Sequence, residues 1–326
     1  MKKHGGLKVF ACILAVLAVF FTVINVIPPK KVTETNPFIK GDGELPMIAA
    51  HRGGGISNPE NTLMAYRAAV NEYGIQICET DVWMTSDGHL VYSHDSTINR
   101  MACEEGAEKV TIAEHTLAEL RTYNMGYNFK DPDTGEYIYR DKTEKEQEAL
   151  GLKILEFDEL MAEFYETNKE LLFIVEIKNG EETGYRAADI IDETLTSRFP
   201  DYKNSIVIGT FHPEIEKYLK EQHPTLMRGG STAGAGKFIF TQMLGVNLFA
   251  NVDFTCLQIP MSYTIKGIKL NLTRTSYIKR AHRRNMAVQF WTINDADDMR
   301  FLIERDVDAI MTDDPKLLKK VLEEYK

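Results

Sequence analysis

The sequence of 326 residues predicts an α/β fold in which eight parallel strands close into a barrel. Eight short apolar runs alternate with segments of helical period, which is typical of strands buried on both faces and joined by helices. The 280 residues after position 46 are close to the roughly 250 residues typical of an eight-stranded α/β barrel. A doubly wound open sheet is the alternative, which the lack of a G-x-G-x-x-G motif after the first strand disfavours.

The chain begins with a candidate membrane segment. Residues 9–27 contain no charge over 19 positions. The run is longer than the roughly 7 to 15 apolar residues of a signal peptide, and it ends in Ile-Pro-Pro instead of a small-residue cleavage site. We therefore expect a retained single-span transmembrane helix, with cleavage as a signal peptide as the alternative. The flanking lysines are Lys2, Lys3, Lys8, Lys30 and Lys31.

Three lysines before the span and two after it set the expected orientation. By the positive-inside rule, this bias favours an N-terminus in the cytoplasm and a folded domain on the other side of the cell membrane. Residues 1–8 then form a short tail, 9–27 the anchor, 28–46 a flexible linker rich in Pro, Lys and Thr, and 47–326 the folded domain.

The strands and helices follow in alternating order after the linker. The predicted strands span 47–50, 75–82, 172–178, 205–210, 225–229, 256–260, 286–292 and 308–313. Helical periods occupy much of the sequence between them, at 62–73, 183–195, 213–222, 276–285 and 295–305, and a last one at 315–325 closes the chain. Residues 101–150 interrupt the alternation of strands and helices with turn-forming and charged stretches. We interpret them as an insertion between barrel units. A disordered surface loop is the alternative.

The net charge of the chain limits which classes of binding partner we expect. The formal net charge is −10, and because the first 46 residues are net positive, the remainder is more acidic still. Such a charge repels polyanions, so we expect no nucleic-acid partner. An anionic substrate would need cations or a metal placed locally at its site. Hydrophobic residues make up 44% of the chain, which excludes collagen-like and wholly disordered proteins.

Three carboxylates are predicted at the barrel mouth, where the strands of such a fold end. Glu79 and Asp81 have i, i+2 spacing, as do Glu176 and Lys178, so the members of each pair share one face of a strand. Acids that share a site repel one another unless positive charge lies among them. A divalent cation that prefers oxygen ligands, Mg²⁺ or Ca²⁺, would supply it, and pairing with Lys178 and Arg52 is the structural alternative.

Two histidines form a second candidate group. His51 and His94 each follow an apolar run of strand type, and His94 is next to Asp95, which is able to orient its ring. A pair of histidines can accept a proton from an attacking group and donate one to a leaving group. The structural alternative is that either ring is simply a packed member of the mouth.

The ordered motifs around these residues resemble the glycerophosphodiester phosphodiesterase family. That family's pattern is HRG, PENT, E-x-D-V, T-x-D-G and then HD with a following arginine. The chain has them at 51–53, 59–62, 79–82, 85–88 and 94–100, followed by IVEIK at 174–178, WTIN at 291–294 and IMTDDP at 310–315. The resemblance covers residues 47–326. It implies a TIM (β/α)8 barrel with a small insertion after the second strand.

The resemblance also implies an activity and a role for each candidate residue. His51 and His94 would be the catalytic acid and base, and Glu79, Asp81 and Glu176 would bind one divalent cation, Ca²⁺ or Mg²⁺. Arg52 and Lys178 would bind the phosphoryl group, and Trp291 would line the glycerol or leaving-group side.

The implied reaction is metal-dependent hydrolysis of a small or polymeric glycerophosphodiester to glycerol phosphate and an alcohol, at the membrane surface. The alternatives are a phospholipase acting on intact or lyso lipids and a non-catalytic barrel that binds phosphate esters. The sequence leaves open which histidine is the base, and whether water or a neighbouring substrate hydroxyl attacks first.

Two segments before the seventh strand are more apolar than the loops of a soluble barrel require. They are residues 234–249 and 260–270. Packing within the barrel is one interpretation, and docking on a bilayer or a lipid-like substrate is the other.

Overall fold

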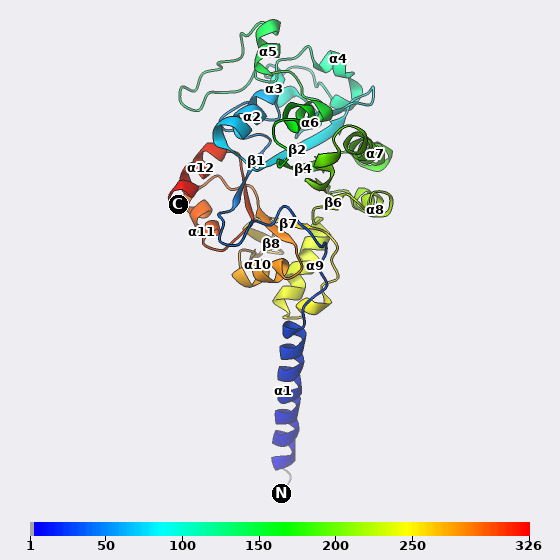
Figure 1. Ribbon diagram of the computed structural model, residues 1–326, viewed down its shortest axis with the longest axis vertical. Helices are drawn as coiled ribbons and strands as arrows, with labels where there is room; N and C mark the ends of the chain where they lie inside the picture. Colours follow the sequence, from blue (N-terminus) through cyan, green and yellow to red (C-terminus); the bar gives the residue numbers. More distant parts are fainter. Residues whose placement is uncertain (1–2) are drawn as a thin grey trace.

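Eight parallel strands form a nearly closed barrel in the computed structural model, which describes the backbone of residues 3–326 and the side chains of residues 6–326 (Figure 1). The sheet runs in the order β6-β5-β4-β2-β1-β11-β10-β7, and a single parallel bridge between Gly229 and Cys256 joins its two edges. The predicted strands are confirmed as β1 (Met47–His51), β2 (Ile77–Met84), β4 (Leu172–Ile177), β5 (Ile206–Gly209), β6 (Met227–Arg228), β7 (Cys256–Ile259), β10 (Ala287–Phe290) and β11 (Ala309–Thr312).

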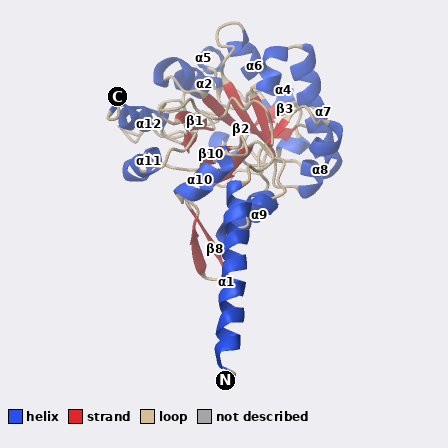
Figure 2. Cartoon of the chain, turned by 60° about the horizontal axis from the view of Figure 1, so that its bottom comes forward, coloured by secondary structure: helices blue, strands red, loops and turns tan. Residues whose placement is uncertain are grey.

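Helices cover the outside of the barrel, as Figure 2 shows. Each predicted helical period contains a helix, because its apolar stripe packs on the sheet while its polar face meets solvent. The covering helices are α2 (Leu63–Ala68), α6 (Phe157–Tyr165), α7 (Glu181–Ser197), α8 (Pro213–Gln222), α9 (Thr232–Met243), α10 (Thr275–His282), α11 (Ala296–Ile303) and α12 (Pro315–Glu323). Shorter helical turns lie at Ala69–Tyr73, Pro200–Asn204 and Asn247–Phe249, the last labelled η4.

The insertion is a folded substructure. It follows a hairpin in which β3 (Leu90–Tyr92) pairs antiparallel with β2. It contains α3 (Asn99–Ala102), a 3-10 turn at Ile112–Glu114, α4 (Leu117–Leu120) and α5 (Glu144–Leu150). Buried side chains including Ile98, Ile112 and Leu120 give it an apolar cluster of its own. The insertion therefore fits the predicted barrel with a small insertion and differs from the alternative of a bare disordered loop.

The inside of the barrel is apolar below the site. Ala49, Ile77 and Ile174 point into it, and Phe38 closes this cluster from outside the strands.

Phe38 belongs to the segment predicted as a flexible linker. The linker is in fact bound along the barrel: the side-chain amide of Asn36 donates to the carbonyls of Thr255 and Asn285, at 2.9 and 3.0 Å. The prediction of flexibility was wrong because composition does not reveal such long-range contacts.

Helix α1 (Lys3–Val26) extends away from the domain (Figure 1). Within it, Gly6–Val26 is the one described helix long and apolar enough to cross a membrane, and only 6% of its most apolar window is buried; a signal sequence near the N-terminus can meet the same criterion. The helix begins inside the expected tail of residues 1–8. Lys2, which contributes to the expected orientation, and the side chain of Lys3 lie outside what the structure describes.

Candidate active site

The predicted site residues meet where the first strands end. His51 on β1 lies beside Glu79 on β2, and Asp81 two positions later lies beside Glu176 on β4. Because side chains alternate along a strand, Glu79 and Asp81 share the inward face of Ile77. The acids at the barrel mouth therefore lie directly above the apolar interior. Both side chains are buried there, since Glu79 is 5% exposed and Asp81 is 1% exposed.

His51 is held by a carboxylate that the sequence prediction did not include. Its Nδ1 N–H donates to Oδ1 of Asp313 over 2.5 Å, and Asp313 in turn accepts from the amide of Asn294 at 2.7 Å. Burial alone would lower the pKa of His51, but the charges of Glu79 and Asp313 hold it above its usual value. The bond to Asp313 assigns the Nδ1 tautomer, so Nε2 faces the mouth, 3.9 Å from Glu79.

Lysine and arginine lie among the three acids. The ammonium of Lys178 contacts Asp81 at 2.9 Å and Glu176 at 2.8 Å, and Nε of Arg52 lies 3.6 Å from Asp81. Burial, then the charge of Asp81, raises the pKa of Glu79 to about 7. Burial likewise raises the pKa of Glu176, although Lys178 opposes the shift. The positive charges of Lys178 and Arg52 therefore balance only part of the negative charge of the three acids.

The three acids offer a candidate set of ligands for a divalent cation. Within residues 3–326, no three His, Cys, Asp or Glu side chains lie close enough together to hold a metal ion as they stand. The ammonium of Lys178 occupies the space between two of the acids, and a cation would require it to move aside. Oδ2 of Asp81 is nevertheless buried without a hydrogen-bond partner, and the acids present only hard oxygen donors. On those two observations the residues fit Mg²⁺ or Ca²⁺.

His94 lies on the rim, where its Nδ1 N–H donates to Asp95 over 2.8 Å. Asp95 also accepts from Arg100 at 2.7 Å, and Arg100 in turn makes two hydrogen bonds to Glu60, at 2.6 and 3.1 Å. Burial would raise the pKa of Asp95, but these bonds from His94 and Arg100 hold it below its usual value. A hydrogen-bonded chain therefore fixes the second histidine as Asp313 fixes the first.

The turn after β1 brings Arg52 back toward the acids. Arg52 has a positive φ of 54°, and its backbone N–H donates to Oε2 of Glu79 at 3.0 Å. Gly53 follows with φ 81°, and a Cβ there would lie 2.9 Å from that of Ala65. Only glycine fits this close approach without strain, which explains the HRG motif physically.

The structure brings His51, Arg52, Glu79, Asp81, Glu176 and Lys178 into one group of contacting side chains. Burial raises the pKa of Glu176, and the charge of His94 is among the effects that oppose this shift. Trp291 is partly exposed after β10, and its side chain makes no hydrogen bond to the group within the described residues. The sequence prediction missed Asp313, Asn294, Glu60 and Arg100 as supporting residues. These four residues belong to motifs that the sequence analysis identified. Only the fold shows which side chains they contact.

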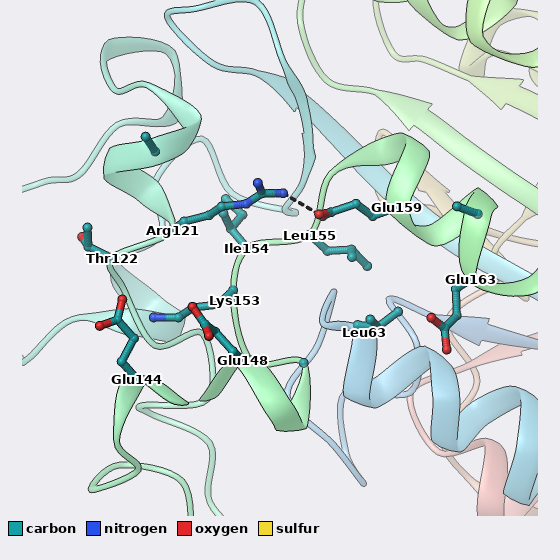
Figure 3. A pocket seen from close by; sticks show the side chains of 13 residues that line it. Leu63, Arg121, Thr122, Glu144, Glu148, Lys153, Ile154, Leu155, Glu159 and Glu163 are labelled. Atoms are coloured by element: carbon teal, nitrogen blue, oxygen red, sulfur yellow. Dashed lines mark hydrogen bonds and ion pairs between the residues drawn. The ribbon is translucent and has the colours of Figure 1, made fainter. Parts of the chain in front are cut away.

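A separate pocket of about 700 Å³ lies between the insertion, α2 and α6 (Figure 3). Arg121 from the insertion side reaches Glu159 of α6 over 2.6 Å across it. Of the described residues that line this pocket, none belongs to the predicted site. It is a groove between substructures and adds no group to the barrel mouth.

Comparison with known proteins gives a family match over most of the chain. Residues 51–317 match the model of the Glycerophosphoryl diester phosphodiesterase family. A glycerophosphodiester phosphodiesterase of Caldanaerobacter subterraneus is 27% identical over 275 residues, which cover 83% of this chain and 96% of the relative. One from Bacillus subtilis is 22% identical over 340 residues and covers both chains fully.

Solved structures share the fold. The glycerophosphoryl diester phosphodiesterase domain of a Mycobacterium tuberculosis protein aligns with a TM-score of 0.68 at 17% identity, covering 85% of this chain and 99% of that one. A phosphodiesterase of Oleispira antarctica, solved with the product sn-glycerol-3-phosphate, aligns with a TM-score of 0.60 at 20% identity, covering 86% and 97%. Both support the barrel described above.

Proposed function

Because the chain belongs to the Glycerophosphoryl diester phosphodiesterase family, we propose that its barrel mouth hydrolyses glycerophosphodiesters with the help of one divalent cation. The products are glycerol phosphate and an alcohol. The observation that carries the proposal is the convergence of two fixed histidines on a partly compensated acidic cluster. A binding protein for phosphate esters needs cations but has no use for two histidines oriented by carboxylates.

The cation would be held by Glu79, Asp81 and Glu176. When bound, it supplies positive charge that neutralises phosphoryl oxygens and favours attack at phosphorus. Lys178 and Arg52 are already directed at the same place, so both contribute charge to the phosphoryl oxygens once substrate competes for them. Trp291 is proposed to line the glycerol or leaving-group side from the end of β10.

The histidines carry the proton transfers. Nε2 of His51 faces the mouth because Nδ1 is bound to Asp313, so this atom accepts or releases the proton. His94 is oriented by Asp95 in the same way from the rim. One ring deprotonates the attacking oxygen, of water or of a neighbouring substrate hydroxyl, and the other protonates the leaving oxygen.

We further infer that α1 anchors the enzyme in the cell membrane with the barrel outside the cytoplasm. The support is the length and apolar composition of Gly6–Val26 and the lysine bias around it. The anchor would keep the enzyme at the membrane surface.

Turnover by the purified full-length protein tests this function. Glycerophosphocholine, lysophosphatidylcholine and a glycerophosphate polymer are assayed with and without chelator. We expect glycerol phosphate from at least one glycerophosphodiester, and activity that chelator abolishes and Mg²⁺ or Ca²⁺ restores. The Glu176→Ala substitution should lower turnover by orders of magnitude. Glu136 is an exposed acid of the insertion, and the Glu136→Ala substitution should leave turnover unchanged. Turnover of the lysolipid alone would favour a phospholipase, and full activity in demetallated protein would contradict the role of the cation.

A further inference from the structure

The charge of the chain is unevenly distributed. Residues 222–294 contain nine Lys or Arg and a single acid, Asp253, although the whole chain carries 48 acids against 38 Lys and Arg. This segment includes α9, η4 and α10, together with the hairpin of β8 (Ser262–Ile265) and β9 (Ile268–Asn271). This stretch of an acidic protein is therefore basic. Lys237, Lys266, Lys269 and Lys279 form no salt bridge within the described residues, so their charge is available.

The same segment exposes large apolar side chains. On α9, Phe238 and Ile239 pack inward, yet Phe240, Met243 and Leu244, the residue that follows the helix, are half or more exposed. Phe249 of η4 is 57% exposed. The neighbouring helix α8 instead exposes Lys and Glu on its outer side, as a helix facing water should. We call Phe240, Met243, Leu244 and Phe249 the α9–η4 face.

This face is continuous with the C-terminal end of α1. The side-chain amide of Asn25 donates to the carbonyl of Gly245 at 2.9 Å, directly after α9. Arg280 of α10 bridges the two, since it donates to Asn25 at 3.2 Å and to the carbonyl of Gln242 at 3.3 Å. Arg283 donates to the last carbonyls of the helix, with the shortest bond, 2.7 Å, to Asn25. Figure 1 shows α9 and α10 at the end of the domain from which α1 emerges.

We propose that the α9–η4 face rests on an anionic bilayer surface beside the point where α1 enters it. This inference builds on the proposed membrane anchor. Apolar side chains at such a position enter the headgroup region, and unpaired lysines, including Lys237 on the same helix, gain attraction from lipid phosphates. The polar contacts of Asn25, Arg280 and Arg283 hold the domain against the helix, so the barrel is held in one orientation on the membrane.

Depth-dependent fluorescence quenching tests the docking. Phe240→Cys and Phe249→Cys, each in the full chain with Cys12→Ser, are labelled with an environment-sensitive fluorophore and reconstituted into vesicles containing phosphatidylglycerol and nitroxide lipids. Ile138→Cys is the control, because Ile138 is exposed and belongs to the insertion, whose helices α4 and α5 lie at the opposite end of the domain from α1 (Figure 1). We expect at least twofold quenching at positions 240 and 249 and none at 138.

The outcomes separate docking from anchoring. Protein that floats with the vesicles but shows unquenched probes at 240 and 249 would overturn docking and leave the anchor intact. Probes that are shifted to the blue without quenching, to an extent that rises with protein density, would show that a second copy covers the face, and this too would overturn the proposal. Protein that fails to float would overturn the anchor and the docking together.

Discussion

Replacing Asp313 by asparagine tests how the site controls His51. The substitution keeps the size of the side chain and removes its charge, while Asn294 remains able to hold it in place. Asp313 is the only carboxylate recorded at Nδ1 of His51 among the described residues, and the bond is 2.5 Å long. The perturbation therefore acts at Nδ1 of a ring that is proposed to transfer protons.

The hydrogen bond between His51 and Asp313 suggests how large the loss in kcat should be. A hydrogen bond to a charged group contributes about 1.5–3 kcal/mol, which corresponds to a loss of roughly 10-fold to 10²-fold in kcat if the imidazolium forms in the transition state. The carboxylate also helps to raise the pKa of His51, against the effect of burial. Its removal should lower that pKa, because the acceptor that favours the charged ring is lost, and the limb of the pH profile that belongs to His51 should move to lower pH.

The assay is kcat and kcat/KM against pH with glycerophosphocholine. Asp298→Asn, on an exposed acid at the start of α11, provides the matched control and should behave as the wild type. A profile for Asp313→Asn that keeps its limbs in place, with kcat within twofold of wild type, would refute the assignment of Asp313 as the residue that positions His51.

Other predictions concern stability and substrate binding. Phe38→Ala should destabilise the fold by about 3–5 kcal/mol in denaturant titrations, since Phe38 is fully buried at the end of the barrel, whereas Ile138→Ala should change little. The folded protein holds the Glu79 proton more tightly than the unfolded chain, so this group lowers stability as pH rises from about 4.5 to about 7. Without divalent cations, Glu79→Gln should therefore be more stable than wild type at pH 8, on the order of 1–3 kcal/mol, and equal at pH 4; equal stability at both values would contradict the raised pKa. Lys178→Ala should raise KM and lower kcat together, because its ammonium, which contacts Asp81 and Glu176, is proposed to neutralise the phosphoryl group; an unchanged KM would contradict this role.

The sequence predicted the barrel because its signal is periodic. Eight apolar runs such as 172–178 are interspersed with six helical periods, and the order of the motifs resembles that of the glycerophosphodiester phosphodiesterase family. The i, i+2 spacing of Glu79 and Asp81 was enough to place both on one face, and β2 confirms it. Local patterns of this kind survive in the fold because burial enforces them.

What the sequence could not reveal depends on contacts between distant segments. Asp313 is 262 positions from His51, and no local pattern shows that they share a hydrogen bond. The binding of residues 28–46 along the barrel was missed for the same reason, because Asn36 finds its acceptors 219 and 249 positions away. The uneven charge of residues 222–294 was present in the sequence, but its meaning depends on the position of α1.

Turnover by histidine variants tests most directly whether the barrel mouth performs the phosphodiesterase reaction. kcat for glycerophosphocholine is measured for His51→Ala, His94→Ala and His115→Ala. The ring of His115, in the insertion, hydrogen-bonds the carbonyl of Thr111 and no other group among the described residues. We predict losses of about 10²-fold to 10⁴-fold for the first two and none for the third. Near wild-type kcat in both His51→Ala and His94→Ala would contradict the account, and the two rings would then be structural members of the mouth.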